Sequence, residues 1–479
     1  MESSHPVPTR VLFVSPECAP MTKTGGLGDV SQALPEALRD CGVDVRSLLP
    51  GYGEVLREIG RAEPVAKLSL LGFECRLLRA DPLLVLDCPH LYAREGGGPY
   101  QRHDGRDWDD NALRFGVFSR AAALLGGERT PLDWHAQVVH CHDWPAALAP
   151  VYLRAEAQRA ATLMTIHNLS FQGNYDAALL SALELPPESF NAEGLEFYGR
   201  LSFLKGGIAY ADAINTVSPT YASEILAPEL GCGLDGLLRH RREALSGILN
   251  GIDTRSWDPA NDTRIARRYD AQSLELKAVN KADLQQRLGL RVDATLPVLG
   301  MVGRFTQQKG IDLVGAAADQ LVAIPAQVAV LGQGDREHES ALVAIAARHP
   351  GRMAVRVGFN EDLAHAIEAG ADLFLMPSRF EPCGLNQMYS QRYGTPPVAR
   401  ATGGLIDTVV DGLTGFLFDR AESAGLVAAV RRALAAYADP ARWNQIQRAG
   451  MTRDFSWAAA ARRYADLYRR LSTMPQRLG

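Results

Sequence analysis

Long apolar segments are missing from this sequence of 479 residues. A membrane-spanning helix needs roughly 20 apolar residues, and no stretch of the chain approaches that length. The opening residues MESSHPVPTR contain no apolar core of a secretory signal, and the apolar run that follows them is only as long as a strand. We therefore expect no membrane partner and a cytoplasmic location.

Paired cysteines and a strong net charge are also missing. The seven cysteines are odd in number and scattered, with no CxxC pair, which fits a reducing compartment. The formal net charge of -5 gives no sign of a basic surface that could follow a phosphate backbone, so no nucleic-acid partner is expected. This net charge does not exclude binding of a neutral polymer.

Metal and nucleotide-binding signatures are incomplete. His140 and His142 flank Cys141, and residues two apart on a strand share a face, so both imidazoles could meet one ligand. No further cluster of cysteine or histidine completes a zinc site, and we predict no metal and no cofactor. Two glycine-rich segments with lysines, at residues 23–29 and 303–310, lack the Gly-Lys-Ser/Thr ending of a Walker A motif.

What is present is a globular composition, with 47% hydrophobic and 22% charged residues. The length predicts two domains. Strand-length apolar runs alternate with helical patterns, beginning with RVLFVSPE, GDVSQALPEALRDCG and VDVRSLLP. This alternation predicts the α/β fold class with parallel sheets. A loop rich in Asp, Asn, Pro and Gly, NGIDTRSWDPANDT, separates two such series.

The boundaries follow from this pattern. We predict a first domain at residues 1–252, a second at 253–455 and a C-terminal helix at 456–479. The apolar side chains that form one stripe of this helix are Trp457, Ala461, Tyr464, Leu467 and Leu471. Such a stripe must pack on another element.

Polar residues follow several predicted strands, and the carboxyl ends of parallel strands form the usual ligand-binding edge of a sheet. In the first half, Lys23 with Gly25 and Gly26 lies between the first strand and the first helix, which suits an anion. A glycine turn with an exposed lysine explains the same pattern equally well. Asp143 and His167 also follow strands, where a ligand site and a core or capping role are both open.

The second half repeats this arrangement. Arg304 and Lys309 converge after one strand, although each alone could be a solvated loop charge. Glu381 follows the strand ADLFLMP and is the leading carboxylate candidate. The turn Thr402-Gly403-Gly404 can offer backbone N–H groups to a phosphate.

Taken in this order, the motifs resemble those of the bacterial glycogen synthase and plastid starch synthase family. The matching segments are SPECAPMTKTGGLGDV, HCHDWPAALAPVYL, TIHNLSFQG, INTVSPTYASEI, ILNGIDTRSWDP, GRFTQQKGIDL and SRFEPCGLNQMYSQRYGTPPVARATGGLIDTV. The resemblance implies a GT-B architecture, with two Rossmann-like domains facing each other across a deep cleft and the C-terminal helix crossing back to the first. Pro145 departs from the family, which usually has histidine there.

The same resemblance implies two sets of site residues. The catalytic set is Asp143, His167, Arg304, Lys309 and Glu381. The substrate-binding set is Lys23, Gly25, Gly26, Asn250, Tyr393, Thr402, Gly403 and Gly404. In the family, the cation pair binds the donor's diphosphate, the acidic residue of the EPCGL motif lies near the transferred sugar, and the glycine turn meets the distal phosphate.

The implied activity is transfer of glucose from ADP-glucose to the non-reducing end of an α-1,4-glucan, such as glycogen or a malto-oligosaccharide, with retention of configuration. A UDP-glucose-dependent glucan synthase remains an alternative, because no residue diagnoses the base. Other enzymatic alternatives are a sugar-nucleotide epimerase and an α-glucan phosphorylase, but no lysine is a convincing carrier for the phosphorylase's pyridoxal phosphate. Outside enzymes, the alternative is a catalytically silent protein that binds glucan or nucleotide sugar.

Overall fold

The computed structural model describes residues 8–474, so the outer ends of the predicted first domain and C-terminal helix, at 1–7 and 475–479, lie outside the described part. The chain divides into two compact units. One unit runs to Gly251 and resumes at Trp457, and the other is Ile252–Ser456. No helix in the described part is both long and apolar enough to cross a membrane.

The first unit is built on a nine-stranded sheet with the order β12-β11-β7-β6-β1-β2-β5-β4-β3. The strands are β1 (Arg10–Val14), β2 (Asp44–Pro50), β3 (Glu63–Leu70), β4 (Phe73–Ala80), β5 (Leu83–Asp87), β6 (Val138–His142), β7 (Ala161–Ile166), β11 (Ala213–Thr216) and β12 (Leu245–Gly247). The strands from β12 to β5 in this order are parallel, and β4 and β3 extend the sheet in antiparallel pairing. A small antiparallel sheet contains β8 (Asn174–Asp176), β10 (Arg200–Ser202) and β9 (Glu196–Phe197).

Helices cover both faces of the large sheet. They are α1 (Gly26–Asp40), α2 (Gly53–Ile59), α3 (Pro89–Tyr92), α4 (Asn111–Gly126), α5 (Asp143–Ala146), α6 (Ala149–Leu153), α7 (Leu179–Ala182), α8 (Phe203–Tyr210), α9 (Pro219–Glu224), α10 (Asp235–His240) and α19 (Trp457–Thr473). Side chains of β1 alternate between two cores, because successive residues of a strand point to opposite faces. Leu12 and Val14 join the core that contains α4, α6 and α8, whereas Val11 and Phe13 join the core that contains α1 and α19.

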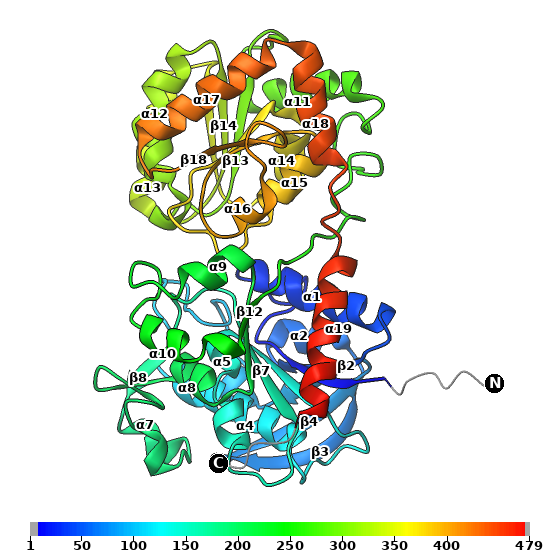
Figure 1. The fold of residues 1–479 in the computed structure, drawn as a ribbon, viewed down its shortest axis with the longest axis vertical. Coiled ribbons are helices and arrows are strands. Elements are labelled where there is room, and N and C mark those ends of the chain that lie inside the picture. Colours follow the sequence, from blue (N-terminus) through cyan, green and yellow to red (C-terminus); the bar gives the residue numbers. More distant parts are fainter. Residues whose placement is uncertain (1–7, 475–479) are drawn as a thin grey trace, which may run out of the picture. The chain divides into compact units, whose positions relative to one another are not determined.

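The C-terminal helix α19 belongs to the first unit. Figure 1 shows it beside α1, although the two helices come from opposite ends of the sequence. Its buried side chains are Trp457, Ala460, Ala461, Tyr464, Ala465, Leu467, Tyr468 and Leu471. The prediction that this helix returns to the first domain is confirmed, and the buried stripe includes all five residues that the sequence indicated.

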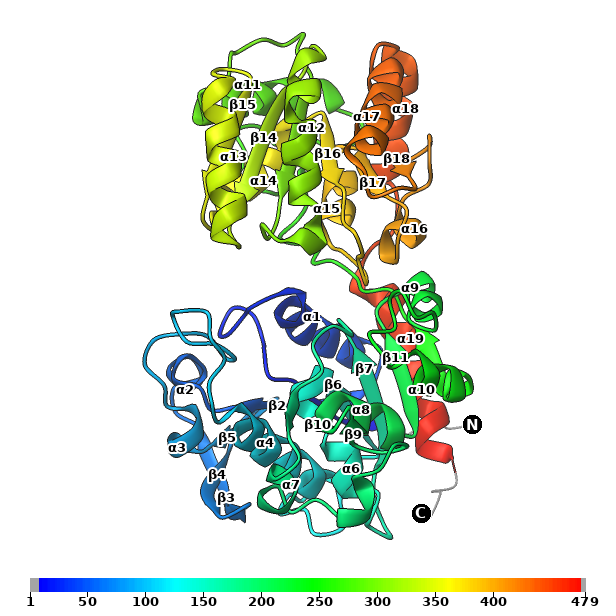
Figure 2. The same cartoon turned by 90° about the vertical axis from the view of Figure 1, so that its left-hand side faces the viewer.

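The second unit is built on a fully parallel sheet with the order β15-β14-β13-β16-β17-β18. Its strands are β13 (Val298–Val302), β14 (Gln327–Gly332), β15 (Met353–Val357), β16 (Leu373–Met376), β17 (Pro397–Arg400) and β18 (Phe416–Phe418). Its helices are α11 (Lys277–Leu288), α12 (Ile311–Ala323), α13 (Arg336–Arg348), α14 (Glu361–Gly370), α15 (Asn386–Arg392), α16 (Gly404–Thr408), α17 (Ser423–Tyr437) and α18 (Pro440–Met451). Figures 1 and 2 show α12, α13 and α17 on one face of this sheet and α11 and α14 on the other.

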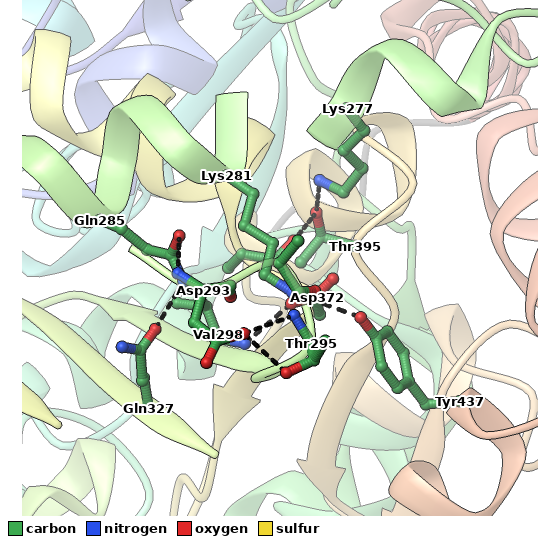
Figure 3. A network of polar contacts seen from close by, with 12 residues as sticks. Lys277, Lys281, Gln285, Asp293, Thr295, Val298, Gln327, Asp372, Thr395 and Tyr437 are labelled. Carbon is green, nitrogen blue, oxygen red and sulfur yellow. Dashed lines mark hydrogen bonds and ion pairs between the residues drawn. The ribbon is translucent and has the colours of Figure 1, made fainter. Parts of the chain in front are cut away.

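Buried polar contacts attach α11 to the sheet of the second unit (Figure 3). The Lys277 ammonium donates to the carbonyl of Ala369 at 2.5 Å and to the hydroxyl of Thr395 at 2.7 Å. One turn later, Lys281 pairs with Asp372 at 2.8 Å. Burial lowers the pKa of Lys277 to about 7. The bond from Lys277 to Ala369 satisfies a carbonyl group in the last turn of α14, which the backbone of that helix cannot pair.

Candidate active site

The candidate residues of the first unit follow three neighbouring strands. The segment that contains Lys23 follows β1, Asp143 follows β6 and His167 follows β7, and these strands are adjacent in the sheet. Carboxyl ends of neighbouring parallel strands lie on one edge, as the prediction required. The structure therefore gathers these residues on one side of the first unit.

Asp143 and His167 are directly connected. The backbone N–H of His167 donates to Oδ1 of Asp143 at 2.7 Å. Burial raises the pKa of Asp143 to about 7, and hydrogen bonds from the backbone of His167 and Asn168 oppose this shift. Asp143 adopts a φ of 54°, a left-handed conformation that is uncommon outside glycine. Strain of this kind is typical of functional sites, where surrounding contacts hold it in place.

Glu17 organises the lysine segment and was missed as a site residue in the sequence. Its carboxylate accepts from the backbone N–H of Thr24 at 2.6 Å and of Gly25 at 3.3 Å, and from the hydroxyl of Tyr100 at 2.7 Å. Burial raises the pKa of Glu17, and these hydrogen bonds counteract the rise. The rule that selected Glu381, a carboxylate after a buried strand, would have found Glu17. No comparable signal marks Tyr100, which lies in an irregular segment.

The remaining predicted residues of the first unit differ in exposure. Lys23 is exposed and forms a 2.7 Å ion pair with Asp29. Gly25 precedes α1 and Gly26 is its first residue. A cavity of about 340 Å³ adjoins this segment, lined by Thr24, Gly97, Gly98, Tyr100, Gln101, Arg102 and His103. Asn250 is buried, and its Oδ1 has no hydrogen-bond partner among the described residues.

The second unit brings its charged candidates together at the edge formed by β13, β16 and β17. Nζ of Lys309 lies 2.6 Å from Oε2 of Glu381, and the hydroxyl of Ser378 donates to the same oxygen at 3.0 Å. The Glu381 side chain is 5% exposed and that of Lys309 22%, so only the cation is substantially open to solvent. Arg304 is exposed, and its guanidinium forms no ion pair with the described residues.

The glycine-rich turn contacts the same carboxylate segment. The N–H of Gly404 donates to the carbonyl of Glu381 at 3.0 Å. A Cβ at Gly404 would lie 2.2 Å from the carbonyl oxygen of Cys383, so a larger residue cannot fit. Gly403 has a φ of 47°, and Thr402 is buried. These constraints explain why the turn needs glycines at both positions.

Tyr393 lies elsewhere. Its side chain is fully buried, and its hydroxyl donates to Asp262 at 2.6 Å, next to His365. This side chain offers no surface to a ligand, and we leave it out of the proposed site. Sequence reasoning could not exclude it, because the partner Asp262 lies more than a hundred residues away.

The two histidines of the HCH segment are buried in the first unit. His140 is paired with Tyr468 and Thr165, both at 2.7 Å, and His142 with His167 at 2.9 Å. Within residues 8–474, no three side chains of His, Cys, Asp or Glu gather as a metal ion would require.

Comparisons with known proteins define the class. The family model "Starch synthase catalytic domain" matches residues 10–240, and "Glycosyl transferases group 1" matches residues 285–449. The protein is therefore a glycosyltransferase, and its two units have the GT-B architecture.

Close relatives narrow this class. The glycogen synthase of Aromatoleum aromaticum is 55% identical over 476 residues, and that of Nitrosospira multiformis is 49% identical over 479 residues. Each alignment covers 96% of both chains. The catalytic domain of starch synthase IV from Arabidopsis thaliana, bound to ADP and acarbose, superposes with a TM-score of 0.83 at 30% identity, covering 98% of this chain and all of that one. The chain belongs to the glycogen synthase and starch synthase family and is a hexosyltransferase.

Proposed function

We propose that the protein transfers glucose from ADP-glucose to the non-reducing end of an α-1,4-glucan, glycogen or a malto-oligosaccharide, with retention of the anomeric configuration. The observation that carries the proposal is the Lys309–Glu381 pair at the edge of the second sheet, with Arg304 in the same segment after β13 as Lys309. Family membership supports the reaction. The ADP bound to starch synthase IV supports the choice of base.

The charged residues of the second unit match what this reaction needs. As the bond to the diphosphate breaks, negative charge grows on the leaving phosphate and positive charge grows on the sugar. Arg304 and Lys309 stabilise the first charge more strongly in the transition state than in the ground state, which is how binding energy accelerates chemistry. Glu381 stabilises the positive charge on the sugar. Backbone N–H groups of the Thr402–Gly404 turn add donors for the distal phosphate.

The first unit serves the sugar side of the same reaction in this proposal. Asp143 ionises near neutral pH and can balance positive charge on the sugar. Lys23 supplies a cation, and His167 and Asn250 supply hydrogen-bonding groups for sugar hydroxyls. The cavity beside Thr24, which Tyr100 lines, is a candidate place for a glucose unit of the acceptor, so we assign the acceptor to this unit and the nucleotide to the other.

For retention, the acceptor 4-hydroxyl attacks from the face that the diphosphate leaves, and the leaving phosphate accepts its proton. This step uses no metal and no cofactor. We also propose a reducing compartment such as the cytoplasm, which the seven cysteines without any disulfide support.

The test compares initial rates of glucosyl transfer onto glycogen from ADP-glucose and UDP-glucose. We expect a larger kcat/KM with ADP-glucose and undiminished activity in excess EDTA. A larger kcat/KM with UDP-glucose would show that UDP-glucose is the preferred donor. Absence of transfer from both donors would favour a catalytically silent binding protein. Loss of activity in EDTA that a divalent ion restores would contradict the metal-free step.

A further inference from the structure

A pair of imidazoles, one fully buried and one partly buried, links the interior of the first sheet to the candidate site. His142 is the last residue of β6, where it is opposite Thr165 of β7, and His167 follows β7 directly. Nδ1 of His142 lies 2.9 Å from Nε2 of His167. His142 is fully buried, packed against the rings of Phe13 and His140 at centroid distances of 4.0 Å. His167 is only partly buried.

Both rings are neutral, so each carries one N–H. Burial lowers the pKa of His142 well below its usual value and lowers the pKa of His167 to about 3. A 2.9 Å contact between two ring nitrogens is a hydrogen bond only if one nitrogen donates and the other accepts. Two arrangements are therefore available, and they place the proton of His167 on different nitrogens.

The surroundings of His142 distinguish these arrangements. Its Nε2 is buried and has no hydrogen-bond partner among residues 8–474. If His167 donated, the proton of His142 would lie on this Nε2, and a buried N–H would remain unpaired. If His142 donates from Nδ1, its Nε2 carries only a lone pair. Unpaired buried N–H groups are rarer than unpaired acceptors, so donation from His142 is the favoured arrangement.

We infer that His142 is a positioning residue that keeps the ring proton of His167 on Nδ1, so that His167 presents a hydrogen-bond donor to a sugar oxygen. This inference rests on the proposed function for the identity of the ligand. It assigns a role to a histidine that is fully buried in the first unit.

The assignment fixes what His167 can do. An Nδ1 that carries a proton donates to the lone pair of a hydroxyl oxygen, and it cannot accept a proton from the acceptor hydroxyl. Asp143 fixes the backbone of His167 through its 2.7 Å hydrogen bond, while His142 fixes the ring. Together they set the direction and the polarity of this hydrogen bond before substrate binds, which is preorganisation.

The test reads the position of the proton directly. We would label the full-length protein with ¹⁵N-histidine, assign the His167 resonances by their loss in His167→Gln, and identify the protonated nitrogen from long-range couplings. We expect Nδ1–H in the wild type. In His142→Leu, Nε2 loses its donor, so we expect the proton to redistribute to Nε2 and kcat to fall about tenfold, the effect of one hydrogen bond.

Two further variants separate positioning from packing. His142→Asn offers an amide N–H near the position of Nδ1, and we expect it to keep the proton of His167 on Nδ1 and to restore kcat to within about threefold. Tyr468→Phe removes a buried hydroxyl that bonds His140 at 2.7 Å in the same layer. It should lower stability and leave the position of the His167 proton and kcat unchanged.

Several results would overturn the inference. A wild-type His167 with its proton on Nε2 would refute it without any variant, even if His142→Leu failed to fold. An equal loss of kcat in Tyr468→Phe and His142→Leu would reduce His142 to a packing residue. If the wild type transferred no glucose, the proposed function would fail, but the tautomer would still be measured.

Discussion

The two units present polar groups at the carboxyl edges of their sheets in opposite electrostatic settings. In the first unit, Asp143 and His167 are partly buried, and burial raises the pKa of Asp143 and lowers that of His167, which favours the neutral form of each. In the second unit, Arg304 is exposed and Lys309 is partly exposed, beside the nearly buried Glu381. The first arrangement favours directed hydrogen bonds to an uncharged sugar, and the second favours compensation of charge on a diphosphate.

This contrast shows that the same fold can form two kinds of site, depending on how far the residues after the strands are buried. Both sheets expose the same parallel-strand edge. In the first unit, the backbone N–H of Thr24 and the hydroxyl of Tyr100 donate hydrogen bonds to the buried carboxylate of Glu17. In the second unit, the carboxylate of Glu381 is paired with the ammonium of Lys309. An anionic ligand can compete with the carboxylate for that ammonium.

The largest expected effect is on Glu381. Glu381→Gln keeps the shape but removes the negative charge, so we expect kcat to fall by about a hundredfold or more. Binding of ADP, measured by calorimetry, should not weaken, because Lys309 loses its competing anion. A variant with near wild-type kcat would show that the transferred sugar is stabilised from the first unit alone.

Next in size is the effect of removing the cation. Lys309→Ala should weaken ADP binding about tenfold to a hundredfold, since a charge-assisted hydrogen bond contributes roughly 1.5 to 3 kcal/mol. Arg348→Ala on α13 is the control. That side chain is 61% exposed, and its ion pair with Asp319, at 3.6 Å, is a surface pair that contributes little. Normal ADP affinity in Lys309→Ala would place the phosphate-binding cations elsewhere.

A smaller effect is expected from Asp143. With a pKa of about 7, this carboxyl ionises as the pH rises through neutrality, so kcat/KM should rise through the same range. Asp143→Asn should lack this rise and have about a tenfold lower kcat/KM at pH 8. Between pH 4 and 7 the native carboxyl binds more protons than the unfolded one. The free energy of unfolding of the wild type should therefore fall as the pH rises through this range, relative to that of Asp143→Asn. An unchanged pH profile in Asp143→Asn would assign the ionisation to another group.

For Lys277 we expect no effect on catalysis, only an effect on stability. Its pKa of about 7 is far below the ordinary 10.5, yet it lies in the structural network of Figure 3. Between these values the unfolded chain binds the extra proton, so stability should rise with pH, by about 2 kcal/mol from pH 7 to 9. Lys277→Met should remove this rise in denaturant unfolding and leave kcat unchanged. A loss of kcat would contradict a purely structural role.

Much of the fold was predictable because its signals are local. The alternation of apolar runs gave the α/β class, and the carboxyl-edge rule selected Lys309 and Glu381, which the structure brings within 2.6 Å. The apolar stripe of the last helix required a packing partner. The antiparallel pair β3 and β4, which extends the first sheet, left no equally clear pattern.

Contacts between distant residues were not predictable in this way. Tyr100 reaches Glu17 across 83 residues, and Tyr393 is withdrawn from the surface by Asp262, 131 residues away. The pairing of His142 with His167 depends on the register of β6 and β7, which the sequence does not specify. Such contacts decide whether a polar residue meets a ligand or another side chain.

The return of α19 to the first unit also affects how the chain can fold during synthesis. The second unit, Ile252–Ser456, is continuous in sequence, whereas the first unit needs residues from both ends. Val11 and Phe13 share a core with Tyr464 and Tyr468, so the part of this face that α19 covers, beside α1, stays exposed until the last helix leaves the ribosome. Domains usually complete their folding in the order of translation. Here the second unit can complete its folding before the first unit. A premature stop codon near the end of the gene would therefore damage the first unit, most of which is translated earlier.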